Sequence, residues 1–174
     1  GKLIQQPVYR LLGGPVRESI TCYATSDDLD WSKELGFTKF KISNPSHYLE
    51  GDSGIREVVT HIEQARKIIG FDRDLMINPV MSYNVEFALR LLEKIKPYNL
   101  RWFEEPLIPT NIDGLAEIRK KAPWIAIATG EDHHGRHAFL DLVERKAADI
   151  LQPDLQWGGG LTEAMKIHSI GESA

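Results

Sequence analysis

The sequence has little cysteine, no long apolar run and no excess of positive charge. Its single cysteine, Cys22, excludes a disulfide framework within the chain and is typical of a reducing compartment, so we expect a cytoplasmic location. No apolar run approaches the roughly 18 residues that cross a membrane, and residues 1–10 lack the apolar core of a secretory signal. The formal net charge of −4 predicts neither a nucleic acid nor a membrane as a partner.

Several catalytic motifs are also missing from the chain. There is no phosphate-binding P-loop, no GxSxG elbow, no HExxH zinc motif and no CxxC pair. The remaining composition is ordinary: 174 residues are 42% hydrophobic and 26% charged, which is typical of a globular protein of about one domain. This composition fits neither a disordered chain, nor collagen, nor a coiled coil.

Segments typical of strands and of helices alternate along the chain. The alternation predicts six strands, at residues 20–25, 37–42, 74–78, 101–103, 125–129 and 149–151. It predicts a helix after each of them, at residues 28–35, 55–69, 83–96, 113–121, 136–146 and 162–171. Residues 43–54 are expected to be a polar loop. Six successive β-α units favour an α/β fold with a parallel sheet and right-handed crossovers.

Two parallel architectures fit this pattern. A doubly wound sheet usually carries a glycine-rich turn after its first strand, whereas the predicted first strand here ends in Ala24-Thr25-Ser26-Asp27. A TIM-type (β/α) barrel needs eight strands and about 250 residues. Six units would then form a partial barrel, and a chain that starts within an expected helix and ends on another is interpreted as a fragment.

Polar residues at the ends of the predicted strands favour the barrel. They are Lys41, Asn78, Glu104, Glu105, Glu131, Asp132 and Asp154. A barrel brings the carboxyl ends of its parallel strands to one rim, where barrel enzymes carry their chemistry. A carboxylate after a strand is often only the cap of the next helix. Capping explains these residues poorly, because Pro106 or a histidine pair, rather than a helix start, follows the glutamates.

The residue types at this rim indicate a metal site. Asn78, Glu104 and Glu131 would offer oxygen ligands from neighbouring strands, and Mg²⁺ prefers oxygen. Asn78 is the weakest of the three, because its amide brings no negative charge. Lys41 can act as a base or polarise a carboxylate, while Lys39, on the same face, has the alternative of reaching into solvent.

Asp154 follows the sixth predicted strand, and six histidines are distributed along the chain. Asp154 either belongs to the turn that contains it or orients a histidine on a following strand, which the chain does not include. His133 and His134 follow Glu131 and are expected to line the site. The remaining histidines are expected in the long loop or on outer helix surfaces; they are His47, His61, His137 and His168.

Several stretches of the sequence carry a family resemblance. They are PVYRLLGG at 7–14, YAT at 23–25, LMINPVMS at 75–82, WFEEP at 102–106, GEDHH at 130–134, and DILQPDLQW at 149–157, which runs on to GGLT at 159–162. On these motifs the chain resembles the enolase superfamily, in its mandelate racemase branch, and within that branch the L-rhamnonate dehydratase family. The resemblance covers essentially the whole chain.

The resemblance implies roles for individual residues. Asn78, Glu104 and Glu131 would be the three metal ligands, and Asp154 would be the partner of a catalytic histidine. Lys41 stands at the first lysine of the racemase KxK motif, and a serine replaces the second, as in the dehydratases. Asn78 departs from the aspartate of the family.

The resemblance also implies that the segment after the fifth predicted strand binds the substrate. Asp132, His133 and His134 would contact the substrate, although Asp132 stands where the dehydratases have histidine. The implied activity is Mg²⁺-dependent dehydration of an acid sugar, an L-rhamnonate-like aldonate, to a 2-keto-3-deoxy acid through an enediolate. Residues 1–19 would be the end of an N-terminal capping domain with its linker, and residues 20–174 an incomplete barrel from a homo-oligomeric enzyme. The alternative is a truncated barrel fragment with no activity of its own.

Overall fold

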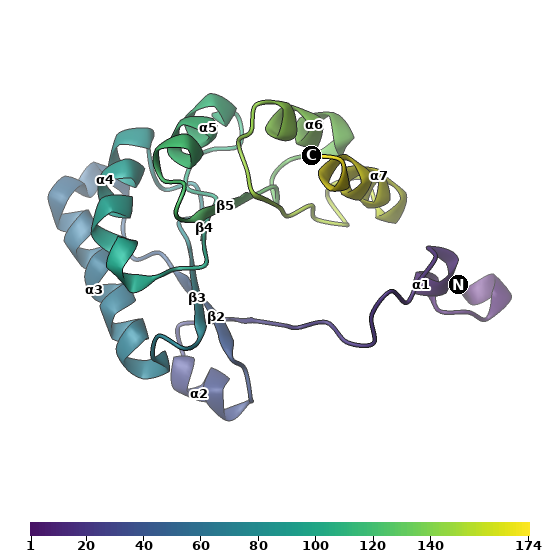
Figure 1. The fold of residues 1–174 in the computed structure, drawn as a ribbon, viewed down its shortest axis with the longest axis horizontal. Coiled ribbons are helices and arrows are strands. Elements are labelled where there is room, and N and C mark those ends of the chain that lie inside the picture. Colours follow the sequence, from purple (N-terminus) through teal and green to yellow (C-terminus); the bar gives the residue numbers. More distant parts are fainter.

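A six-stranded parallel sheet forms the centre of the computed structural model, which describes all 174 residues. The strands are hydrogen-bonded in their order along the chain, from β1 to β6. Because β1 and β6 do not pair with each other, the sheet remains open, as the interpretation of a partial barrel predicted (Figure 1). The strands are β1 (Ala24–Thr25), β2 (Lys39–Ser43), β3 (Asp74–Asn78), β4 (Trp102–Glu104), β5 (Ala126–Thr129) and β6 (Ile150–Leu151).

A helix follows each strand and lies on the outer side of the curved sheet (Figure 1). These helices are α2 (Leu29–Glu34), α3 (Gly51–Ile69), α4 (Val85–Ile95), α5 (Ile112–Lys121), α6 (Gly135–Glu144) and α7 (Leu161–Glu172). None of them combines the length and the apolarity that crossing a membrane requires. The right-handed β-α repeat thus accounts for most of the chain.

The main core lies between the sheet and these helices. Ile55, Val58 and Ile62 recur at helical spacing along α3, so one face of the helix packs on the strands. The next helix, α4, begins at Asn84, whose side chain accepts a hydrogen bond from the backbone amide of Phe87 at 2.8 Å. This core contains 28 buried residues, with Phe87 among its largest side chains.

The opposite face of the sheet carries a second, smaller cluster. Met76, Trp102 and Ala128 form it. Their immediate neighbours along the strands, such as Ile77 and Phe103, belong instead to the main core. Side chains alternate between the two faces of a strand. The same alternation places Asn78 on the face of Met76 and Glu104 on the face of Trp102. Lys41 lies between two residues of the main core, so it also projects from the face of the smaller cluster, which is the inner face of the curved sheet.

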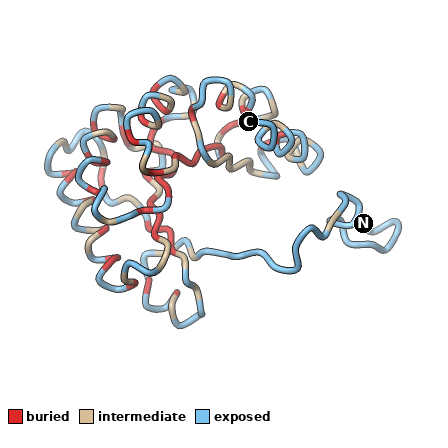
Figure 2. The backbone as a smooth tube through the Cα atoms, in the orientation of Figure 1, coloured by how far each residue is buried: buried red, intermediate tan, exposed pale blue.

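The first 23 residues extend away from the sheet (Figures 1 and 2). They contain a short 3-10 turn, Lys2–Ile4, and the short helix α1 (Val8–Leu11). The predicted strand over residues 20–25 was too long, because only Ala24 and Thr25 pair with β2. The hydrophobic residue at the start of that prediction, Ile20, is 77% exposed and has no neighbouring strand.

The predicted polar loop at residues 43–54 was also too long. Ser43 belongs to β2, a 3-10 turn spans Tyr48–Glu50, and α3 begins at Gly51. Lys41 consequently lies two residues before the end of its strand rather than at the end. The other element boundaries agree with the predicted ones to within two residues, which is the usual uncertainty at the ends of elements.

Candidate active site

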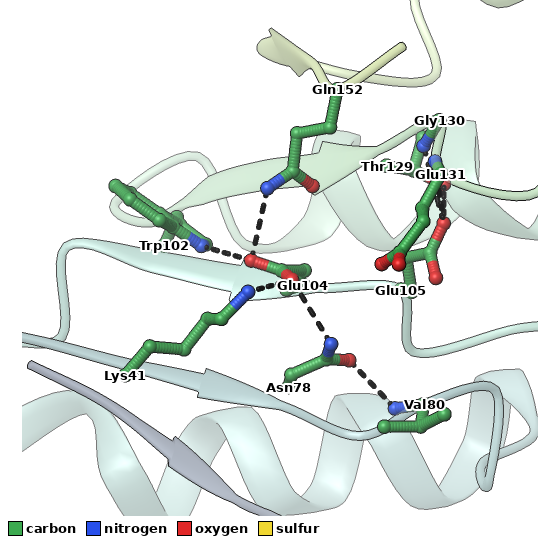
Figure 3. A network of polar contacts seen from close by, with 10 residues as sticks. All are labelled: Lys41, Asn78, Val80, Trp102, Glu104, Glu105, Thr129, Gly130, Glu131 and Gln152. Carbon is green, nitrogen blue, oxygen red and sulfur yellow. Dashed lines mark hydrogen bonds and ion pairs between the residues drawn. The ribbon is translucent and has the colours of Figure 1, made fainter. Parts of the chain in front are cut away.

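The buried carboxylate of Glu104 lies at the centre of a polar cluster on the inner face of the sheet (Figure 3). One oxygen, Oε1, accepts hydrogen bonds from Lys41 Nζ and from Asn78 Nδ2, the latter at 2.9 Å. The other, Oε2, accepts from Trp102 Nε1 at 2.8 Å and from Gln152 Nε2 at 3.0 Å. Strands β2, β3 and β4 and the segment after β6 therefore all contribute to one carboxylate, which is 1% exposed.

An ion pair dominates the electrostatics of this cluster. The Lys41 ammonium contacts Glu104, and both side chains are almost fully buried. Burial by itself disfavours the ammonium, but the hydrogen bond and the negative charge of Glu104 outweigh it and raise the pKa of Lys41. The pair is thus one positive and one negative charge in mutual contact, surrounded by neutral amide and indole groups and by the Tyr23 ring, whose centroid lies 5.3 Å from Lys41 Nζ.

The side chain of Asn78 has a defined orientation. Its oxygen, Oδ1, accepts from the backbone amide of Val80 at 2.8 Å, while its nitrogen donates to Glu104. Exchanging the two ends of the amide would place an oxygen against the carboxylate and an NH₂ group against the Val80 amide. The hydrogen-bond network therefore determines which end of Asn78 faces Glu104.

Strained backbone lies beside these residues. Val80, Met81 and Glu105 have φ values of 49°, 61° and 42°, in the left-handed region that side chains with a Cβ rarely occupy. Met81 donates its backbone amide to the carbonyl of Glu105 at 2.7 Å, which connects the two strained loops. Such strain is concentrated at functional sites, where the surrounding structure maintains it.

The second glutamate of the pair has a different role. Glu105 Oε1 accepts from the backbone amides of Gly130 and Glu131, at 3.2 Å and 3.1 Å, and so fixes the turn that follows β5. Burial raises the pKa of the Glu105 carboxyl, and the neighbouring carboxylates, including Asp132, raise it further, while the Gly130 amide acts in the opposite direction. Glu105 thereby fixes the backbone of Glu131 directly after the end of β5.

The three predicted metal ligands are arranged unequally. Asn78 and Glu104 meet, but through an N–H donor rather than through two oxygens. Glu131 is exposed, and its carboxylate makes no hydrogen bond in the structure. No group of three histidine, cysteine, aspartate or glutamate side chains converges closely enough to hold a metal ion. The carboxylate oxygens of Glu104 and Glu131 remain the charged oxygen donors of the site.

The remaining predicted site residues lie around this cluster. Asp154 Oδ1 accepts from the backbone amides of Gln156 and Trp157, at 2.7 Å and 2.6 Å, which caps the turn after β6. None of the six histidines makes a hydrogen bond or ion pair with Asp154 or with Glu104; the one histidine ion pair is between His61 and Asp27. These two hydrogen bonds give Asp154 the turn role, and its role beside a histidine stays a prediction.

The segment after β5 places its two histidines differently. His133 is buried against Phe139, with ring centroids 6.1 Å apart, and burial lowers its pKa. His134 is exposed at the start of α6 and lines a small cavity of about 350 Å³ together with Trp157. Asp132 is half-buried and makes no side-chain hydrogen bond.

Two residues of the cluster were missing from the sequence prediction. Trp102 lies two positions before Glu104 on the same face of β4, a spacing that identifies it once the strand is known. Gln152 immediately precedes Pro153 and Asp154 after β6, and of these three residues only the aspartate was predicted from the sequence to have a site role. Its side-chain oxygen, Oε1, is buried without a hydrogen-bond partner, which leaves one open acceptor next to Glu104.

A β-α sheet with a buried charged cluster at the carboxyl ends of its strands is the arrangement that β/α-barrel enzymes use. The chain belongs to the family described as "Enolase C-terminal domain-like", whose sequence model matches residues 27–174.

Individual relatives narrow the comparison. A curated L-rhamnonate dehydratase from Saccharopolyspora erythraea is 40% identical over 174 residues, which cover 99% of this chain and 45% of that protein. A crystal structure of L-rhamnonate dehydratase from Gibberella zeae is 35% identical with a TM-score of 0.95, and the match covers 99% of this chain and 44% of that one. A further Gibberella zeae rhamnonate dehydratase structure, complexed with Mg, has the same identity and TM-score and is covered to 42%. The chain thus spans less than half the length of these relatives.

Proposed function

We propose that the protein carrying this chain is a hydro-lyase that removes water from an acid sugar, an L-rhamnonate-like aldonate, to give a 2-keto-3-deoxy acid. The observation that carries the proposal is the Glu104 carboxylate, buried at the carboxyl end of β4 and contacted from four parts of the sheet. The relative from Saccharopolyspora erythraea, named L-rhamnonate dehydratase, supports this substrate class.

Mg²⁺ is the proposed cofactor. Glu104 and Glu131, with the side-chain oxygen of Asn78, would hold it, because hard divalent cations take carboxylate and carbonyl oxygens. The open acceptor of Gln152 next to Glu104 fits a site that receives a further cation or donor group. When bound, Mg²⁺ supplies positive charge that stabilises the anion developing on the carboxylate of the substrate.

The proposed reaction removes one molecule of water from the substrate. The C–H bond next to the carboxylate breaks and its proton passes to a base, while the electron pair forms the enediolate. The C–O bond of the β-hydroxyl then breaks, and the leaving oxygen takes a proton and departs as water. The resulting enol gains a proton on carbon and becomes the ketone. The family resemblance assigns the base to a histidine outside this chain, oriented by Asp154.

The chain's own residues would bind and position the substrate. The Lys41 ammonium projects from β2 into the cluster, where it can orient a substrate carboxylate by charge. Asp132, His133 and His134 would contact the hydroxyl groups of the sugar from the segment after β5. We also propose that residues 1–19 belong to a capping domain and its linker, residues 20–174 to the barrel, and the whole to a cytoplasmic homo-oligomer.

Incubation with a panel of aldonates tests the proposal. The protein carrying this chain, supplied with L-rhamnonate and related six-carbon aldonates, is expected to form a 2-keto-3-deoxy acid, detected by proton NMR. Glu104→Gln is expected to abolish the product, whereas Glu117→Gln, at an exposed helix position, should leave it unchanged. Failure to convert any aldonate while the protein remains folded would contradict the proposal.

The second candidate is a barrel fragment without activity of its own. The absence of any histidine contact to Asp154 favours it for the 174-residue chain taken alone. It predicts that this chain folds but leaves every aldonate unchanged under the same conditions. Turnover by the isolated 174 residues would exclude it.

A further inference from the structure

The Glu104 carboxylate has no hydrogen-bonding capacity left. A carboxylate offers about four acceptor sites, and four N–H donors occupy them here. The donors come from β2 and β3, from β4 itself and from the segment after β6. A divalent cation that binds Glu104 must therefore replace at least one of these donors.

The charges of the cluster are also already matched. Lys41 contributes the one positive charge in contact with Glu104, and Asn78, Trp102 and Gln152 are neutral. Lys39 is the other basic residue on the inner side of β2. Its Nζ lies 2.9 Å from Asp74, the first residue of β3, so it pairs with that carboxylate and not with Glu104. The ammonium of Lys41 thus occupies the position of a counter-ion that a metal would otherwise fill.

Asn78 reinforces the same arrangement. The backbone amide of Val80 holds Oδ1, so the NH₂ group faces Glu104. An aspartate at this position would keep the Val80 hydrogen bond with one oxygen and direct the other at Glu104. Two facing carboxylates need a cation between them, whereas an amide and a carboxylate do not.

From this geometry we propose that the Lys41 ammonium is an internal counter-ion for Glu104, supported by the hydrogen bond from the Asn78 amide, and that Mg²⁺ must displace these two N–H contacts in order to bind. The inference rests on the proposed function, since it concerns the metal named there. It assigns a new role to Lys41: besides orienting substrate, it sets the affinity of the site for the metal by competing for the same carboxylate. Removing either competitor strengthens Mg²⁺ binding.

Isothermal titration of the protein with MgCl₂, without substrate, tests this role. Lys41→Gln removes the charge but keeps an amide donor, and it is expected to lower the Kd for Mg²⁺ about tenfold. Asn78→Asp is expected to lower it by a similar factor. Lys39→Gln is the matched control, because it removes one positive charge from the same face of the same strand and should leave the Kd within about twofold.

The melting temperature, measured with and without Mg²⁺, shows whether the variants still fold. Both site variants are expected to melt at a lower temperature than the wild type without Mg²⁺ and to recover on its addition, because the metal then neutralises Glu104. An equal loss with and without Mg²⁺ would show that Lys41 has only a structural role, and would overturn the inference.

The outcomes separate this inference from the proposed function. If the wild type binds Mg²⁺ and Glu104→Gln abolishes binding, but Lys41→Gln binds no better than Lys39→Gln, the counter-ion role is wrong and the metal site stands. If neither the wild type nor any variant binds Mg²⁺, both are wrong. Binding by Lys41→Gln and Asn78→Asp but not by the wild type would support the competition by Lys41 and would contradict Mg²⁺ as the cofactor of the wild-type protein.

Discussion

The side-chain nitrogen of Asn78 lies 2.9 Å from Glu104 Oε1, and this contact joins the carboxyl ends of β3 and β4. An amide can donate to the carboxylate directly, whereas a second carboxylate would repel it. Asn78 thereby lets the two strand ends meet through a direct hydrogen bond. The same contact makes the cluster a structural element of the sheet as well as a candidate binding site.

The first prediction concerns the stability of the ion pair. Glu104→Gln should lower the free energy of unfolding by about 3 kcal/mol, because it leaves the buried Lys41 ammonium without its counter-ion. Urea denaturation followed by circular dichroism measures the change. Glu117→Gln removes one end of the exposed pair with Lys121 and should cost less than about 1 kcal/mol. Equal losses in the two variants would contradict the role of Glu104.

The second prediction concerns the guanidinium of Arg66, which is buried at the end of α3. It donates to the backbone carbonyls of Tyr98, Asn99, Gly70 and Arg73, at distances of 2.7 to 3.0 Å. Arg66→Met should lower the free energy of unfolding by about 2 to 3 kcal/mol, because four partly buried carbonyls lose a charged donor.

The neighbouring exposed residue provides the control for this variant. Lys67→Met removes a positive charge from the same helix turn and should change the stability by less than about 0.5 kcal/mol. A comparable loss for Lys67→Met would show that charge near the end of α3, and not the carbonyl contacts of Arg66, determines stability.

The third prediction is a pH dependence. Hydrogen bonds from Arg136 lower the pKa of the Glu163 carboxyl to about 2, so its ionised form stabilises the contact between α6 and α7. This contribution is fully present above the ordinary pKa of 4.5 and disappears as the pH falls toward about 2. Glu163→Gln should therefore destabilise the protein at neutral pH, and the difference should shrink as the pH is lowered from 4.5 to 3.

Denaturation curves at several pH values give this difference directly. Glu172→Gln, at an exposed position near the end of α7 with no ion pair, serves as the control and should match the wild type throughout. A Glu163→Gln effect that stays constant between pH 7 and pH 3 would be inconsistent with the lowered pKa.

The fourth prediction addresses the strained loop after β3. Val80 combines a φ of 49° with a side chain that is 55% exposed, so it gains little burial in return for its strain. Val80→Gly should raise the free energy of unfolding by about 0.5 to 1 kcal/mol, because glycine adopts this conformation freely. Thr60→Gly, inside α3 at an exposed position, should instead lower it by about 0.3 to 0.5 kcal/mol. Destabilisation by Val80→Gly would mean that the valine side chain has a packing role.

The hydrophobic periodicity of the sequence predicted the six β-α units, whereas the polar residues at the strand ends were needed to favour a barrel over a doubly wound sheet. The spacing of Ile55, Val58 and Ile62 identified α3, and the run Asp74–Asn78 was predicted to the residue. The errors arose where structure depends on distant partners. Ile20 has the β-branched character of a strand residue, yet no neighbouring strand lies beside it.

The site was predictable in its location but not in its contacts. Strand ends in a parallel sheet place Asn78 and Glu104 together, as the sequence order implied. Their orientation depends on the Val80 amide and on the donors Trp102 and Gln152, which come from tertiary arrangement and not from spacing along the chain. The ion pair of Lys41 with Glu104 and its hydrogen bonds could therefore be described only from the structure, while the metal-ligand roles stay predictions.

The most direct test of the central claim is an anomalous diffraction map of the protein carrying this chain, crystallised with Mn²⁺, which takes the same oxygen ligands as Mg²⁺. The account predicts an anomalous peak bonded to carboxylate oxygens of Glu104 and Glu131, with the Lys41 ammonium displaced from Glu104. An ion bound elsewhere, with the Lys41–Glu104 pair intact, would contradict it.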